Sequence, residues 1–124
     1  MRPPVKRNRA MEVTKNITNL KNLKQGWDYG EGDIIEDKVL EKALSIYDTI
    51  SKFNLNCEVH PTSEGGITLV LSKINDDVFL DLEIDNNLNL FLTKEKGISQ
   101  EYETLIDFKS IVIEDLFMEI ENIL

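Results

Sequence analysis

Two segments of the chain repeat apolar residues at the 3.6-residue period of an amphipathic helix. In the first segment the apolar stripe starts at Val13 and continues through Ile17 and Leu20 to Trp27. The second segment predicts the principal and longest helix, over residues 34–53, because its apolar positions share one helix face. Those positions are Ile35, Val39, Ala43, Ile46, Tyr47, Ile50 and Phe53.

Glycines and polar residues separate the two stripes and predict a loop over residues 26–32. Asp33 and Glu36 then have the spacing of a capping box, in which each side chain accepts a hydrogen bond from the other residue's backbone N–H. We expect the Trp27 indole to pack at the junction of the two helices, where the glycines let the chain reverse tightly. The alternative is that Trp27 and Tyr29 are exposed and form a hot spot for a binding partner.

From residue 57 onward the period changes from 3.6 to two, which is typical of strands with one buried face. A short strand over residues 57–60 ends at Pro61, and Gly65-Gly66 predicts a turn. Three consecutive antiparallel strands are expected within residues 66–93, followed by a polar loop over residues 94–100. Their alternating apolar residues are Ile67, Leu69, Leu71, Val78, Leu80, Leu82, Ile84, Leu88, Leu90 and Leu92.

The last part of the chain adds a fifth strand and a helix to the prediction. Tyr102, Thr104 and Ile106 alternate with polar residues, and a helical stripe ends the chain at Ile113, Leu116, Phe117, Ile120 and Leu124. The fold class is therefore α+β, with an antiparallel four- to five-stranded meander packed against two to three helices. We expect one domain over residues 12–124, preceded by a disordered basic arm over residues 1–11.

The hairpin around residues 85–87 determines which side chains share a sheet face. A three-residue loop pairs Ile84 with Leu88, so the leucines of both strands lie on one face. The same register pairs Leu82 with Leu90 and Leu80 with Leu92. The opposite face then carries Phe79, Asp81, Glu83, Asp85 and Phe91. This face is either an interface with an apolar anchor and a charged rim, or core under the C-terminal helix.

Charge divides the chain into a short basic start and an acidic remainder. The 124 residues carry a net charge of −9, and the first nine residues contribute +4 through Arg2, Lys6, Arg7 and Arg9. The remainder holds ten basic and 23 acidic residues, a difference of −13. Such a body repels phosphate backbones, so only the basic arm is a candidate for contact with nucleic acid or an acidic surface.

The single cysteine and the absence of long apolar runs indicate in which cellular compartment we expect the protein. Cys57 alone cannot form an internal disulfide and fits a reducing cytoplasm. No apolar run approaches the roughly 20 residues of a membrane helix, and the basic start does not lead into a signal-peptide core. We therefore expect a cytoplasmic protein that makes no membrane contact.

Candidate chemistry is sparse, and we predict no catalytic, cofactor-binding or metal-ligating residue. Cys57 and His60 are three residues apart on a strand, so their side chains point to opposite faces, which disfavours a thiol–imidazole couple. Asp81, Glu83 and Asp85 have a spacing that could bind a divalent cation, but their strand holds no Lys or His to assist a reaction.

Two segments of the sequence resemble motifs of a known protein family. Following Leu20-x-x-Leu23, the segment Gly26-Trp27-Asp28-Tyr29-Gly30-Glu31-Gly32 resembles the Asn-Trp-Asp-Gly-Tyr-Gly-Ala signature of a family of small, mostly uncharacterised bacterial proteins, and Pro61-x-x-x-Gly65-Gly66-Ile67 is similar to its turn into a strand. The match covers roughly residues 20–92. It departs in having Gly26 for Asn and Gly32 for Ala, and in lacking the glycine between Asp28 and Tyr29. The resemblance implies an α+β fold and a role as an accessory protein of mobile or defence loci, and it transfers no catalytic residue.

The leading hypothesis is a non-enzymatic protein-binding module that docks on a larger, basic intracellular partner and regulates or neutralises it. An antitoxin, an immunity protein or a subunit of a phage-defence system fits this description, and self-association is a further option. The expected partner-binding residues are Trp27, Tyr29, Phe79, Asp81, Glu83 and Phe91. Two alternatives are a small metal-dependent hydrolase or nuclease that uses the carboxylate row, and a nucleic-acid-binding subunit that acts through the basic arm.

Overall fold

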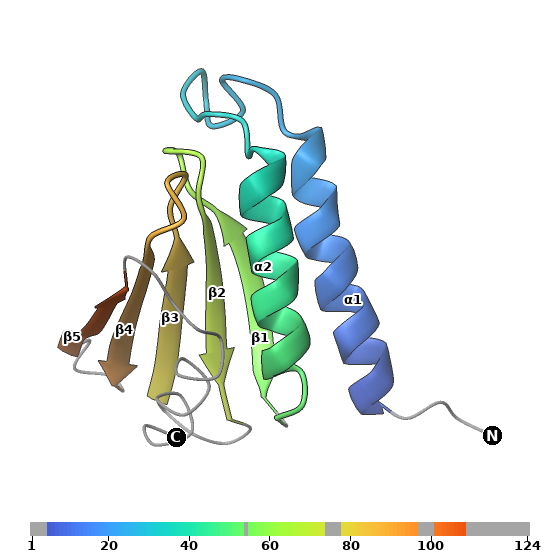
Figure 1. Ribbon diagram of the computed structural model, residues 1–124, viewed down its shortest axis with the longest axis vertical. Helices are drawn as coiled ribbons and strands as arrows, with labels where there is room; N and C mark the ends of the chain where they lie inside the picture. Colours follow the sequence, from blue (N-terminus) through green and yellow to red (C-terminus); the bar gives the residue numbers. More distant parts are fainter. Residues whose placement is uncertain (1–4, 54, 74–77, 97–100, 109–124) are drawn as a thin grey trace.

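The computed structural model describes residues 5–53, 55–73, 78–96 and 101–108, which form two α-helices and one antiparallel sheet (Figure 1). Helix α1 (Val5–Asn19) runs into a short 3-10 helix, η1 (Leu20–Asn22), and α2 (Asp37–Ile50) follows after a long loop. The sheet contains β1 (Asn56–Pro61), β2 (Ile67–Ser72), β3 (Val78–Ile84), β4 (Leu90–Lys96) and β5 (Glu101–Phe108), in that spatial order. This α+β meander confirms the predicted fold class.

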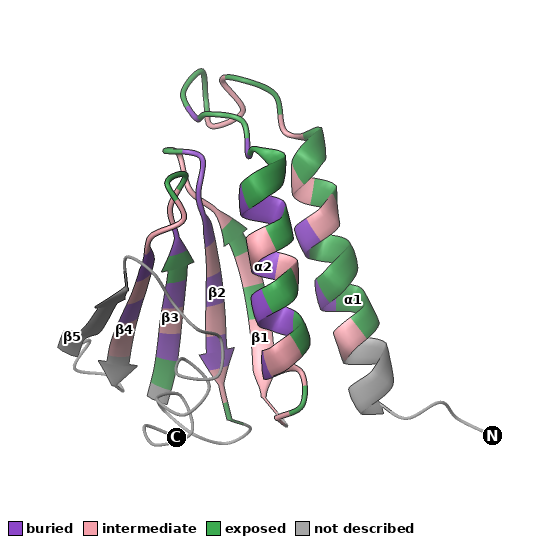
Figure 2. Cartoon of the chain, in the orientation of Figure 1, coloured by how far each residue is buried: buried purple, intermediate pink, exposed green. Residues whose placement is uncertain are grey.

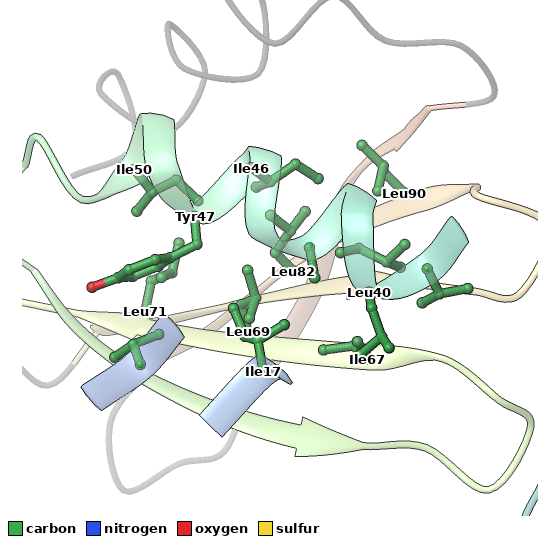
Figure 3. Packing of buried hydrophobic residues seen from close by; sticks show 14 of the residues in the cluster. Ile17, Leu40, Ile46, Tyr47, Ile50, Ile67, Leu69, Leu71, Leu82 and Leu90 are labelled. Atoms are coloured by element: carbon green, nitrogen blue, oxygen red, sulfur yellow. The ribbon is translucent and has the colours of Figure 1, made fainter. Parts of the chain in front are cut away.

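The core lies between one face of the sheet and the two helices. Figure 2 shows buried positions alternating along β2 and β3, as the two-residue period predicts, and Figure 3 shows α2 packed over the sheet leucines. Helix α1 lies beside α2 and against β1 (Figure 1). The buried cluster is Val13, Ile17, Ile35, Val39, Leu40, Ala43, Ile46, Tyr47, Ile50, Ile67, Leu69, Leu71, Leu80, Leu82, Ile84, Leu90 and Leu92.

The first residues of both helices differ from those that the sequence predicts. Helix α1 is already formed at Val5, so the segment expected to be a disordered arm, residues 1–11, is helical from residue 5 onward. With 15 residues α1 is also longer than α2, which has 14, so the prediction that residues 34–53 form the longest helix is wrong.

The predicted capping box does not form. Glu36 is the N-cap of α2 but makes no side-chain capping hydrogen bond. The Asp33 carboxylate accepts instead from Gln25 Nε2 at 2.9 Å, and the Asp33 N–H donates to the Ser63 carbonyl at 2.8 Å. These bonds hold residue 33 in the loop, and the helix starts at residue 37.

The β3–β4 register differs from the prediction by two residues. Ile84 pairs with Leu90 and Leu82 with Leu92, because the connection spans residues 85–89 rather than 85–87. The Asp85 carboxylate accepts from the N–H groups of Asn87 and Asn89 at 2.9 and 2.8 Å, and Leu88 takes a φ of +66°. A shift of two residues keeps the faces unchanged, so the leucines still face the core.

The last two strands, β4 and β5, agree with the prediction in number but not in length. Strand β5 confirms the predicted fifth strand, whereas β4 continues to Lys96 through part of the expected loop at residues 94–100. The predicted C-terminal helix around residues 113–124 lies outside the described residues. None of the described helices has both the length and the apolar composition needed to cross a membrane.

Candidate functional site

The loop between the two helices contains a tight hairpin that presents Tyr29. Asp28 and Glu31 exchange two backbone hydrogen bonds of 2.7 and 2.9 Å, and the residues between them, Tyr29 and Gly30, have φ angles of +52° and +93°. Two positive φ angles at the centre of a two-residue turn define the type I′ geometry, which matches the twist of the flanking chain. A hydrogen bond of 2.8 Å from the Gly26 N–H to the Gly32 carbonyl closes the base of this hairpin.

Trp27 organises the hairpin and is not part of the first helix. Its indole Nε1 donates to the Asp33 carbonyl at 2.8 Å, and its ring lies directly against Gly32. Because α1 ends at Asn19, the predicted apolar stripe does not reach Trp27. The half-buried indole therefore has a structural role, but as the internal support of its own loop and not as an extension of the first helix's apolar stripe.

The hairpin is also fixed to the sheet. Ser63, in the turn between β1 and β2, donates from its Oγ to Asp28 Oδ2 at 2.8 Å. The Ser63 carbonyl accepts from the Asp33 N–H, so one serine connects to both ends of the hairpin segment. The loop after β3 lies next to the same turn, because an ideal Cβ on Gly65 would lie 3.6 Å from Asn86 Cβ. We call these three loops, residues 23–36, 61–66 and 85–89, the loop end of the molecule; Figure 1 shows them at the upper ends of the helices and strands.

Tyr29 stands out within the loop end because the fold gains no packing from it. Its side chain is fully exposed, with a relative accessibility of 104%. Its backbone is in the left-handed region, which glycine and asparagine adopt more easily than tyrosine. Strained, exposed aromatic residues held on a rigid support are typical of binding sites rather than of structural positions.

The second part of the predicted site lies on the sheet face that points away from the leucine core. Glu83 pairs with Phe91 on β4, and Asp81 pairs with Thr93. Together with Thr68 these four residues line a groove of about 370 Å³, which we call the outer groove. Of the described helices, α1 contacts β1, and α2 contacts β2 and β3 on the core face of the sheet. Neither helix contributes a residue to the outer groove.

Phe79 does not belong to the outer groove. It shares the face with Phe91 but lies near the other end of β3, paired with Glu95, and its side chain is 38% exposed. There it lines a separate hollow with residues of β1, β2 and α1. The structure thus separates the six predicted partner-binding residues into three places: Trp27 and Tyr29 in the hairpin, Asp81, Glu83 and Phe91 in the outer groove, and Phe79 in the hollow that it shares with β1, β2 and α1.

The predicted row of three carboxylates is reduced to two. Asp85 lies beyond the end of β3, where its two carboxylate oxygens accept hydrogen bonds from Asn87 and Asn89 and close the β3–β4 loop. Over the residues that the structure describes, no three His, Cys, Asp or Glu side chains form a group that could hold a metal ion. Partial burial, followed by the charges of Glu64 and Asp85, raises the pKa of the exposed Glu83 carboxyl.

The raised pKa of Glu83 predicts a stability effect that depends on pH. A carboxyl whose pKa is higher in the folded state destabilises the fold when it is ionised, so this cost is present at neutral pH and disappears as the pH falls through the raised pKa to the ordinary value of about 4.3. Glu83→Gln should therefore raise the melting temperature at pH 7 and have no such effect at pH 3.5. Glu58→Gln, also on an exposed position of the outer face, is the matched control, and equal shifts for both variants would contradict the assignment.

Cys57 and His60 do not form a pair, as predicted. Cys57 packs against the core, where burial and then the charge of Glu58 raise the pKa of its thiol to about 12. His60 is exposed on the outer face, with its Nε2 atom 3.6 Å from Glu58 Oε2. A neutral, core-facing thiol is a poor nucleophile, so Cys57 has a packing role.

Ser63 is central to the site, although sequence reasoning did not select it. Ser63 is 35 residues from its partner Asp28, and no local pattern indicates such a contact.

Comparisons of the chain with protein-family models, with curated proteins and with solved structures find no match in any of the three. The resemblance to the bacterial family stays a prediction, and the case for function depends on the geometry of the site.

Proposed function

We propose that this protein is a non-enzymatic binding module that docks through its loop end on a larger, basic protein and regulates or neutralises it. The observation that carries the proposal is Tyr29, a fully exposed aromatic side chain held in a left-handed turn. Tyrosine is among the residues that dominate binding energy at interfaces, because it combines a large apolar area with few rotatable bonds.

The support beneath Tyr29 favours binding by a preformed surface. The hydrogen bonds from Trp27 to Asp33 and from Ser63 to Asp28 fix the hairpin before a partner arrives. A preformed contact surface loses less conformational entropy on binding, which increases affinity. The exposed carboxylates of Glu31 and Glu64 are on the same loop end and give it a negative rim.

Charge supports a basic partner in particular. The chain carries a net charge of −9, and beyond the first nine residues the difference between basic and acidic residues is −13. Such a field accelerates association with a positively charged protein and weakens binding to nucleic acid. A role as an antitoxin, an immunity protein or a subunit of a defence complex fits a module that covers the basic surface of a larger protein.

The test is a comparative capture experiment with Tyr29→Asn. Asparagine tolerates the left-handed conformation, so this variant should keep its fold while losing the aromatic side chain. We expect the wild-type protein to capture a basic partner from host lysate and Tyr29→Asn to bind the purified partner at least about 30-fold more weakly, as for loss of a hot spot of about 2 kcal/mol. Isothermal titration with the purified partner measures the change.

Met11→Asn provides the matched control, because Met11 is another exposed apolar side chain, 66% accessible, on α1 and away from the loop end. It should bind the partner as the wild type does. Equal affinity of Tyr29→Asn and the wild type would contradict docking through the loop end. A wild-type protein that captures no more than an unrelated acidic protein would contradict the binding function itself.

A further inference from the structure

The outer groove lies on the outer face of the sheet and brings an aromatic ring next to two carboxylates. Glu83 lies between Thr68 on β2 and Phe91 on β4, so the three side chains form one row across three strands. The next row on the same face contains Asp81 and Thr93. The groove between them has a volume of about 370 Å³, which is large enough for one long side chain and too small for a folded element.

The residue types in this groove select a particular kind of cation. A carboxylate attracts positive charge, and the face of an aromatic ring attracts cations that are weakly hydrated. Threonine hydroxyl groups can accept hydrogen bonds from N–H donors. A hard metal ion gains nothing from a phenyl ring and prefers several oxygen ligands, whereas a planar guanidinium stacks on aromatic rings and donates hydrogen bonds in its own plane.

The electrostatic surroundings of Glu83 also favour a bound cation. Partial burial raises the pKa of the Glu83 carboxyl, and the negative charges of Glu64 and Asp85 raise it further. A positive charge next to this carboxylate would offset the repulsion and lower that pKa.

We propose that the outer groove binds an arginine side chain of the partner, with the guanidinium stacked on Phe91 and donating hydrogen bonds to the Glu83 carboxylate. This inference rests on the proposed function, because it names the side chain that a basic partner inserts. It adds a second contact surface to the loop end, since the groove lies on a sheet face and Tyr29 on the hairpin. Arginine is favoured over lysine because its planar group can stack on the ring face while it donates hydrogen bonds in its own plane to the carboxylate.

The experiment uses N-acetyl-arginine amide as the probe and N-acetyl-citrulline amide as its neutral isostere. Titrations of the ¹⁵N-labelled protein are followed by amide chemical shifts at low ionic strength. We expect saturable shifts at Thr68, Glu83, Phe91 and Thr93 with the arginine probe, weaker binding of N-acetyl-lysine amide, and no saturable shifts with citrulline. Shifts that are absent, or equal for arginine and citrulline, would overturn the proposal.

Three variants locate the binding. Glu83→Gln and Phe91→Leu should each weaken the arginine probe by about threefold or more, the size expected for losing one exposed charge pair or cation–π contact. Glu58→Gln, on the same face but outside the groove, should bind as the wild type does. Equal weakening by Glu58→Gln would show attraction to the acidic face in general and would overturn a specific groove. Circular dichroism of each variant confirms that the fold is intact.

The two proposals can fail separately. Tyr29→Asn should leave binding of the arginine probe unchanged, because the hairpin contributes no residue to the groove. If the probe binds and Tyr29→Asn has no effect on partner capture, the loop-end function is wrong and the arginine groove stands. If capture depends on Tyr29 but the probe does not bind, the groove inference alone is wrong.

Discussion

Replacing Leu82 with aspartate should prevent the chain from keeping its fold at neutral pH. Leu82 has no accessible surface and lies in the centre of the core face, paired with Leu69 on one side and Leu92 on the other. An ionised carboxylate there has no solvent, and the neighbouring side chains in its row are leucines. Burial of such a charge costs several kcal/mol, out of a total stability of about 5–15 kcal/mol for a typical domain.

Urea unfolding followed by circular dichroism measures this effect. Leu82→Asp should show little cooperative unfolding, whereas Leu82→Ala should remain folded and lose about 2–5 kcal/mol, as usual for a truncated core leucine. Ser72→Asp is the matched control, because it places the same charge on the outer face of the sheet, where Ser72 is half-buried. An unchanged midpoint for Leu82→Asp would show that the core face has been assigned to the wrong side.

The sheet was predictable because its two-residue period is a local property. The alternation from Ile67 to Leu92 specifies which side chains face the core even when the strand register is wrong. The register itself depends on the loop after β3, where the Asp85 carboxylate binds two backbone N–H groups and extends the loop to residue 89. Counting residues between strands does not reveal a side chain that closes a loop.

The candidate site was less predictable because long-range contacts hold it together. Asp33 is held outside α2 by a hydrogen bond to the carbonyl of Ser63, which comes from the distant turn between β1 and β2. The outer groove depends on Glu83 and Phe91 being cross-strand neighbours, which the predicted register did not give. The exposed aromatic hairpin was the part of the site that the sequence predicted best, because the density of glycines around Trp27 and Tyr29 already indicated a turn.

Gly32→Ala should be the most damaging single-methyl change in the hairpin. An ideal Cβ at this position would lie 2.8 Å from Trp27 Nε1 and 2.9 Å from Trp27 Cε2, so the indole must move. Moving it breaks the 2.8 Å hydrogen bond from Nε1 to the Asp33 carbonyl. The φ of +94° adds backbone strain, because left-handed geometry costs a residue with a Cβ about 1–2 kcal/mol.

Gly30→Ala separates the strain from the clash. Gly30 has nearly the same φ, +93°, but a Cβ there would meet nothing within 4 Å. This variant should lose only about 1–2 kcal/mol from left-handed strain. Gly32→Ala should lose about 1–3 kcal/mol more, the usual cost of overpacking.

Thermal unfolding gives the two losses, and fluorescence identifies their cause, because Trp27 is the chain's single tryptophan. The emission of Gly32→Ala should shift towards longer wavelengths as the displaced indole meets water, while Gly30→Ala should keep the wild-type spectrum. Equal destabilisation of both variants with unchanged emission would mean that the Trp27 ring does not support the hairpin. The rigid presentation of Tyr29 would then lose its structural basis.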